Sequence, residues 1–218
     1  MLSSSALLRL ITLLSPSFPV GGFSYSHGLE QAVADGLVND FAKLENWLAS
    51  LISHGTAWND AVLFAASFRR GDADLTDLIE LGEALSGSKE RHLEAHAQGA
   101  AFILAAKAGG YTRADTLPDR ASYAIAAGAI AAGQGIDLAD GLAAFIHGFA
   151  SNQVQVAIRL SLFGQADGVR MIAALESLII ETASRAARSS LDDLGGSTIM
   201  AEIAAMRHEA LYSRIFRS

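Results

Sequence analysis

Two histidines stand four residues apart, the spacing at which two imidazole rings can meet on one face of an α-helix. They are His92 and His96, in a chain that has six histidines and no cysteine. A tight metal site needs a third or fourth ligand, which His147 could supply from another helix. Sequence alone does not place His147 beside the pair. We therefore expect no metal ion bound by the chain, and keep an all-α metalloenzyme using His92 and His96 as the alternative interpretation.

A catalytic nucleophile and a nucleotide-binding site have weaker support in the sequence than the metal site. Residues 22–26, Gly-Phe-Ser-Tyr-Ser, resemble a nucleophile elbow without its last glycine, but that elbow needs a strand-to-helix turn above a parallel sheet. We instead expect Ser24 and Ser26 to cap a helix that begins near His27. The chain contains no phosphate-binding G-x-x-x-x-G-K-[ST] motif. We therefore expect no catalytic residue and no tightly bound cofactor, and assign any nucleotide chemistry to a partner protein.

The hydrophobic residues around these groups recur with the period of an α-helix. Leu44, Leu48 and Leu51 belong to one such stripe, and no stretch alternates for long enough to form a β-strand. Alanine is concentrated between residues 95 and 144, and small side chains let helices approach closely. These patterns predict an all-α fold. It is a single-domain bundle of roughly nine or ten helices over residues 1–218, with an Ala-rich central packing.

Composition excludes several classes of protein. The 218 residues are 51% hydrophobic and 18% charged, which is incompatible with a disordered chain. The net charge of −7 argues against nucleic acid, because no basic surplus can displace the counterions of phosphates. The longest uncharged runs, residues 121–136 and 141–158, are too short or too polar for a membrane helix. We expect a cytoplasmic protein whose apolar surplus is covered by its core and by other proteins.

Two segments have the composition of contact surfaces. A Pro/Gly loop at residues 15–26 carries large apolar side chains, which either face a partner or tuck under the first two helices. The C-terminal tail, residues 207–218, combines aromatic residues and arginines, whereas most chain ends are frayed and polar. Aromatic residues and arginine are typical anchors of protein interfaces. We therefore expect the C-terminal tail to bind a partner.

At these two segments the chain closely resembles the family of urease accessory proteins called UreF. The resemblance rests on the run FPVGGFSYSHGLE at residues 18–30 and on HEALYSRIFRS at residues 208–218. The helices between them agree in length and Ala-rich texture. One departure is Met-Ala-Glu-Ile at residues 200–203, where relatives are expected to have a version that contains Pro and Asp.

The resemblance implies an all-α, dimer-forming scaffold without catalytic activity. Family members join the accessory protein UreD, called UreH in some systems, and the GTPase UreG on urease apoprotein. The assembly promotes GTP-dependent insertion of nickel into the urease active site.

The resemblance also implies a set of contact residues. The tail residues that match the family's contact with UreD/UreH are His208, Glu209, Tyr212, Ser213, Arg214, Phe216 and Arg217. The residues that match the family's N-terminal motif, for which a purely structural role is the alternative, are Pro19, Gly21, Gly22, Phe23, Ser24, His27 and Glu30.

Overall fold

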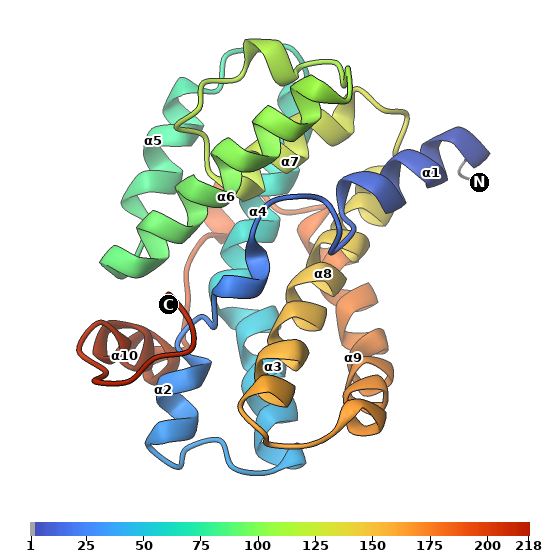
Figure 1. Cartoon of the computed structure of the whole chain (residues 1–218). Helices are drawn as coiled ribbons and strands as arrows, with labels where there is room; N and C mark the ends of the chain where they lie inside the picture. Colours follow the sequence, from blue (N-terminus) through green and yellow to red (C-terminus); the bar gives the residue numbers. More distant parts are fainter. Residues whose placement is uncertain (1–2) are drawn as a thin grey trace.

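The computed structural model describes residues 3–218, which form ten α-helices and three 3₁₀-helices and, within this part of the chain, no β-strand (Figure 1). The all-α prediction and the expected number of helices are confirmed. The α-helices are α1 (Ser4–Leu13), α2 (Leu29–Ala34), α3 (Phe41–His54), α4 (Thr56–Arg70), α5 (Thr76–Ala84), α6 (Lys89–Ala108), α7 (Tyr123–Ala132), α8 (Leu138–Arg159), α9 (Gln165–Ala186) and α10 (Ile199–His208). The 3₁₀-helices are η1 (Gly22–Ser24), η2 (Ala114–Thr116) and η3 (Leu191–Asp193).

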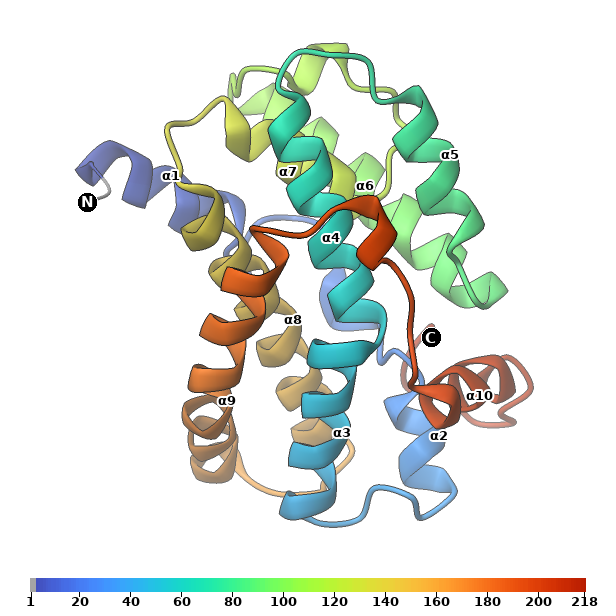
Figure 2. The ribbon, with the colours of Figure 1, turned by 180° about the vertical axis from the view of Figure 1, so that it is seen from behind.

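The helices gather in two groups that share α4. In Figures 1 and 2, α3, α8 and α9 run side by side in the lower half, and α5, α6 and α7 lie in the upper half. Helix α4 packs against α7 in the upper group and against α3, α8 and α9 in the lower group. Helices of both groups therefore bury apolar faces on the same helix, and the chain forms one domain.

Helix α7 supplies the Ala-rich packing at the centre. Every residue from Ala124 to Ala131 is buried. A Cβ atom added to Gly128 would lie only 2.3 Å from the carbonyl oxygen of Phe64 on α4. Small side chains are needed here because they let the two helices approach until their backbones nearly touch. The predicted Ala-rich central packing is confirmed.

Several helices begin at the side chains that the local sequence offers as caps. The carboxylate of Asp40 accepts a hydrogen bond from the Lys43 N–H over 2.8 Å, and that of Asp137 accepts one from the Ala139 N–H over 2.8 Å. Each bond satisfies a donor that the first turn of a helix leaves unpaired.

Helix α2 begins differently. It starts at Leu29 after Gly28, which has a φ of 77° and provides no side-chain cap. The hydroxyl of Ser26 does accept a hydrogen bond from the Glu30 N–H over 3.3 Å. Ser24 makes no such contact because it lies inside η1, so the expected double cap is correct only for Ser26. A Cβ atom at Gly28 would lie 2.7 Å from the backbone nitrogen of Ala205, which shows how closely α10 lies on α2.

The arrangement brings the last helix of the chain beside the second one. Helices α2 and α10 pack together, and the C-terminus lies between them and the lower end of α6 (Figure 1). Across residues 3–218, none of the helices combines the length and apolar character needed to cross a membrane.

Candidate functional site

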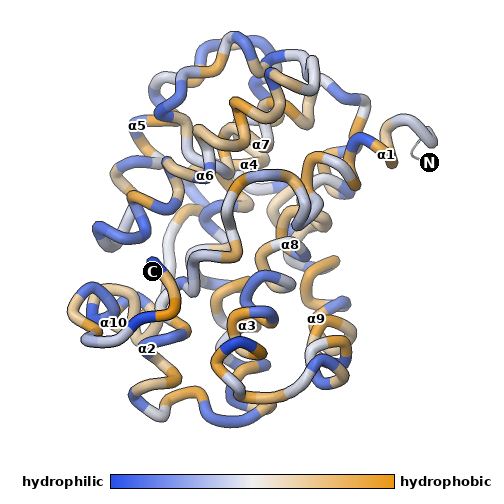
Figure 3. Tube along the Cα trace, in the orientation of Figure 1, coloured by the Kyte–Doolittle hydropathy of each residue, from blue (hydrophilic) through white to orange (hydrophobic). Residues whose placement is uncertain are grey.

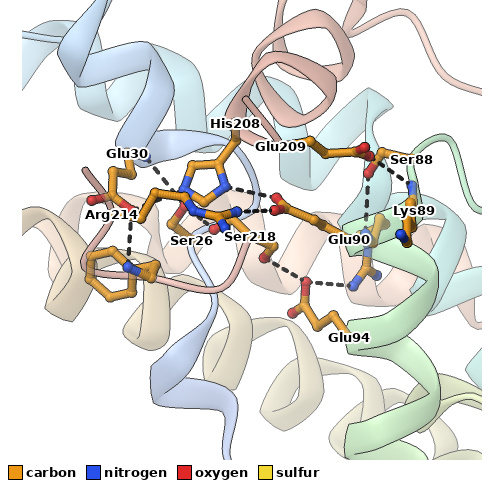
Figure 4. Close-up of polar contacts among 12 residues, drawn as sticks. Ser26, Glu30, Ser88, Lys89, Glu90, Glu94, His208, Glu209, Arg214 and Ser218 are labelled. Carbon is orange, nitrogen blue, oxygen red and sulfur yellow. Dashed lines mark hydrogen bonds and ion pairs between the residues drawn. The ribbon is translucent and has the colours of Figure 1, made fainter. Parts of the chain in front are cut away.

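The two segments singled out from the sequence lie against each other. The backbone N–H of Arg217 donates to the carbonyl oxygen of Ser24 over 2.7 Å, and the N–H of Ser26 donates to the carbonyl oxygen of Ser218 over 2.7 Å. The end of the C-terminal tail therefore pairs with the backbone just before α2, at the site drawn in Figure 4.

The carboxylate of Glu30 binds the backbone of the C-terminal tail. Its side chain is buried on α2, and its Oε1 accepts a hydrogen bond from the Ile215 N–H over 2.7 Å. Its Oε2 accepts one from the Phe216 N–H over 3.0 Å and lies 2.9 Å from Nε2 of His208. These hydrogen bonds occupy both oxygens of a carboxylate that is buried away from water. Glu30 therefore fixes the backbone of the tail at two consecutive residues.

His208 connects Glu30 to helix α6 (Figure 4). The imidazole is fully buried, and its Nδ1 lies 2.7 Å from Oε2 of Glu90. A carboxylate only accepts hydrogen bonds, so both ring contacts are hydrogen bonds when both nitrogens carry a proton. The other oxygen of Glu90 lies 2.6 Å from Nη1 of Arg214. The two carboxylates thus face an imidazole and a guanidinium, which offset the cost of burying them.

Glu94 joins the N-terminal motif, helix α6 and the C-terminal tail. Its side chain is almost completely buried, 2.8 Å from Nε2 of His27 and 3.3 Å from Nη1 of Arg91. The Ser218 hydroxyl donates to Oε2 of Glu94 over 3.2 Å. Burial by itself raises the pKa of Glu94, but the charges of His27 and Arg91 and the hydrogen bonds from His27 and Ser218 outweigh burial and lower the pKa to about 2.

Residues of helices α8 and α6 also contact the tail. The ring of Phe216 is buried, with the guanidinium carbon of Arg159 4.3 Å from its centroid, a cation–π contact. Nη1 of Arg159 also donates to the carbonyl oxygen of Phe23 over 2.6 Å. On α6, the carboxylate of Glu209 accepts a hydrogen bond from the N–H of Lys89 over 3.0 Å, where negative charge favours the start of a helix.

Three large apolar side chains of the same two segments face outward. Phe23 is 70% exposed, Tyr212 fully exposed and Ile215 58% exposed. Figure 3 shows hydrophobic residues flanked by hydrophilic ones along this end of the chain. The backbone that carries Ile215 is fixed by Glu30, so this side chain is presented on a rigid support. Exposed apolar groups held in this way are typical of protein interaction sites.

The contact residues nominated from the sequence divide between the inside and the outside of this site. The buried or half-buried ones are Gly21, Gly22, Ser24, His27, Glu30, His208 and Phe216. The exposed ones are Pro19, Phe23, Glu209, Tyr212, Ser213, Arg214 and Arg217. A role in binding a partner stays a prediction for both groups, and the buried ones can act only by setting the conformation of the segments.

Several residues of the site were not nominated from the sequence. Glu90 and Glu94 lie four residues apart on one face of α6, a spacing that could have indicated a shared role. Nothing in the sequence connects Arg159 with Phe216, because only the packing of α8 brings them together.

The histidine pair forms no larger cluster. The rings of His92 and His96 lie with their centroids 4.3 Å apart. Within residues 3–218, no group of three or more His, Cys, Asp or Glu side chains lies close enough together to hold a metal ion, so His147 does not complete a site with the pair.

Comparison with known proteins gives one consistent result. The family model described as UreF matches residues 38–176. The urease accessory protein UreF of Mesorhizobium japonicum is 53% identical over 218 residues, which are 99% of this chain and 98% of the relative. The urease accessory protein UreF 1 of Brucella canis is 52% identical over 218 residues, 99% of this chain and 95% of the relative. The similarity to these relatives extends over nearly the whole chain and therefore includes both segments of the site.

Proposed function

The chain belongs to the UreF family of urease accessory proteins, and on that premise we propose that it is a scaffold that joins UreD/UreH and the GTPase UreG on urease apoprotein. The assembly promotes GTP-dependent insertion of nickel into the urease active site. Nickel is the cargo of the assembly, and this chain holds no tightly bound cofactor. Proteins of this family are accessory proteins and not catalysts, so the metalloenzyme interpretation of His92 and His96 is not retained.

The observation that carries the proposal is the rigid presentation of exposed anchors. A scaffold needs a surface whose shape exists before the partner arrives, because ordering a flexible tail on binding costs affinity. Buried Glu30 fixes the backbone at Ile215 and Phe216, and Arg159 holds the Phe216 ring. These contacts fix the conformation of the tail before a partner binds.

We assign UreD/UreH to the surface formed by the tail and η1. Tyr212 and Ile215 would be the anchors, with Phe23 beside the Arg159 contact, because all three apolar side chains are exposed and tyrosine is enriched among the residues that supply most of the binding energy in interfaces. The buried residues of the site would act indirectly, by holding this surface in shape. UreG would bind to a different surface of the scaffold. The scaffold would act in the cytoplasm and would be a homodimer.

Co-expression with UreD/UreH tests the assignment of the tail surface. The double substitution Tyr212→Ala and Ile215→Ala should lower the affinity for UreD/UreH about thirtyfold or more, because loss of even one interface anchor costs about 2 kcal/mol. Neither side chain supports the fold, so the thermal unfolding midpoint of the free variant should stay within about 2 °C of the parent.

Leu104→Ala is the matched control, because Leu104 is 71% exposed on α6, outside the tail and η1. This variant should co-purify like the parent protein. Undiminished co-purification of the double variant would show that the tail is not part of the interface.

Light scattering on the purified scaffold without partners tests the homodimer. The measured mass should be twice 22.8 kDa, and a mass of 22.8 kDa would contradict the homodimer.

A further inference from the structure

The fully buried imidazole of His208 lies between two carboxylates, where the end of α10 meets α2 and α6 (Figure 4). Its Nε2 is 2.9 Å from Oε2 of Glu30, and its Nδ1 is 2.7 Å from Oε2 of Glu90. The scaffold function uses this cluster only to hold the tail in shape. It does not depend on how many protons the cluster carries.

The two contacts of the ring need two protons. A neutral imidazole has one N–H and one lone pair, and a lone pair that faces an ionised carboxylate is repelled by it. The oxygens of Glu30 are fixed in place, because they also accept hydrogen bonds from the backbone N–H groups of Ile215 and Phe216. The geometry therefore requires one proton more than a neutral ring and two ionised carboxylates hold. That proton belongs to the cluster as a whole.

The same proton balances the charges of the cluster. Arg214 of the tail is 2.6 Å from the other oxygen of Glu90, so two carboxylates face one guanidinium and one further positive charge. The side chains of His208, Glu30 and Glu90 are only 0%, 6% and 11% exposed. Loss of the proton would leave one of the buried negative charges without compensation, which is strongly unfavourable.

The other charged side chains near His208 already have partners. The pairs are Arg207 with Asp35 on α2, and Arg91 of α6 with Asp60 and Glu94. Glu209 accepts a hydrogen bond from the N–H of Lys89. These contacts need no proton beyond those that arginine and the backbone always carry.

His27 provides a contrast, because it also reaches the tail through a carboxylate. Its Nε2 is 2.8 Å from Oε1 of Glu94, which accepts a hydrogen bond from Ser218. Its Nδ1 is buried and has no partner among residues 3–218. One N–H satisfies this ring, so a neutral His27 keeps its hydrogen bond. The cluster at His208, unlike this contact, loses a hydrogen bond when its proton leaves.

We propose that Glu30, Glu90 and His208 form a proton switch, which holds the C-terminal tail and the end of α10 on α2 and α6 and releases them when the proton leaves. Release places His208 in water, where an imidazole is mostly neutral above about pH 6.5. Docking of the tail above that pH therefore takes up a proton, so docking weakens as the pH rises. One consequence rests on the scaffold function proposed above: the surface for UreD/UreH is assembled at lower pH and lost at higher pH.

Hydrogen exchange in the purified full chain tests the switch, because the backbone N–H groups of Ile215 and Phe216 are protected only while they donate to Glu30. Their protection factors, which remove the intrinsic effect of pH on exchange, should fall between about pH 6 and about pH 9. The fall should reach up to about tenfold per pH unit, the limit for one proton. Constant or rising protection factors would overturn the proposal, whatever any variant does.

Glu90→Gln removes the need for the extra proton. Its amide can donate to Nδ1 of a neutral His208 while its oxygen still accepts from Arg214, and Nε2 of the ring still donates to Glu30. The protection factors of this variant should change less than about twofold over the same pH range. Glu209→Gln is the control, because Glu209 is exposed and contacts α6 without His208, and it should respond to pH like the parent. An equally strong response in Glu90→Gln would contradict the switch.

The affinity for UreD/UreH tests the use of the switch separately. The affinity of the parent should fall with rising pH relative to that of Glu90→Gln, and this ratio removes any pH dependence of UreD/UreH itself. A constant ratio, with protection factors that do respond, would contradict the link to UreD/UreH and leave the switch in place. If UreD/UreH does not bind the tail at all, the scaffold assignment fails, and the exchange of the free chain still decides the switch.

Discussion

Among single residues, Glu30 does the most to define the site. It lies on α2, yet most of its hydrogen bonds go to the C-terminal tail, through the backbone of Ile215 and Phe216 and the ring of His208. Each donor satisfies a carboxylate that would otherwise be buried without a partner, at a cost of several kcal/mol. The same residue therefore stabilises the fold and sets the shape of the surface proposed to bind UreD/UreH.

Glu30→Gln tests this double role. An amide has one accepting oxygen and brings two N–H donors toward groups that are themselves donors, so we expect the free energy of unfolding to fall by about 2–4 kcal/mol. Urea denaturation measures this quantity. Glu209→Gln is the control, because Glu209 also contacts across to α6 but is exposed, and should cost less than about 1 kcal/mol. Equal effects in the two variants would contradict the role given to Glu30.

Among the elements, α4 and α7 depend on the absence of side chains at their crossing. Gly128 faces the backbone of Phe64, as well as the hydroxyl of Ser67, which a Cβ atom would approach to 2.2 Å. Helix α8 also contains a glycine, Gly148, where the nearest atom that a Cβ would meet is the Leu14 carbonyl oxygen at 3.9 Å. The two glycines thus have different physical reasons to be present.

Gly128→Ala and Gly148→Ala should change stability in opposite directions. The methyl group at residue 128 must push α4 and α7 apart, so we expect a loss of about 1–3 kcal/mol or more. The methyl group at residue 148 meets no obstacle and lowers the entropy of the unfolded chain, so a gain of about 0.5–1 kcal/mol is expected. Thermal unfolding of both variants gives the comparison, and a stabilising Gly128→Ala would show that the helix crossing is not tight.

At the scale of the whole molecule, Glu94 connects parts of the chain that are distant in sequence. His27 lies before α2 and Ser218 at the end of the tail, and both contact this one carboxylate, as does Arg91 from the preceding turn of the same helix, α6. Its pKa of about 2 lies below the ordinary value of 4.5, so the folded protein favours the charged form. The stability that Glu94 contributes is therefore linked to pH.

This linkage predicts how stability changes in acid. Because the folded-state pKa is lowered, the contribution of Glu94 is fully present above about pH 4.5 and is lost as the pH falls from about 4.5 toward 2. Glu94→Gln should therefore be clearly less stable than the parent at pH 7, and the difference should narrow steadily below pH 4.5. Urea titrations across this range measure the difference. Glu176→Gln, an exposed change on α9, should show no such narrowing, and a constant difference for Glu94→Gln would contradict the lowered pKa.

Much of the fold follows from local sequence. The recurrence of Leu44, Leu48 and Leu51 predicts α3 because an amphipathic helix buries one face whatever it packs against. Asp137 caps α8 for an equally local reason, and the run of small residues in α7 marks a helix that its neighbours can approach closely. The two segments that form the site also stand out in the sequence, because their Pro, Gly, aromatic and arginine content departs from that of the helices.

Only the tertiary structure decided which residues contact one another within the site. Glu30 and Ile215, or Arg159 and Phe216, lie far apart in the sequence, and no local pattern encodes which distant residue a buried charge or ring will meet. The sequence by itself determined the helices, the central Ala-rich packing and the family. The packing of α2, α6, α8 and α10 decided which residues of the N-terminal motif and the tail are buried and which are exposed, because burial depends on the placement of whole helices.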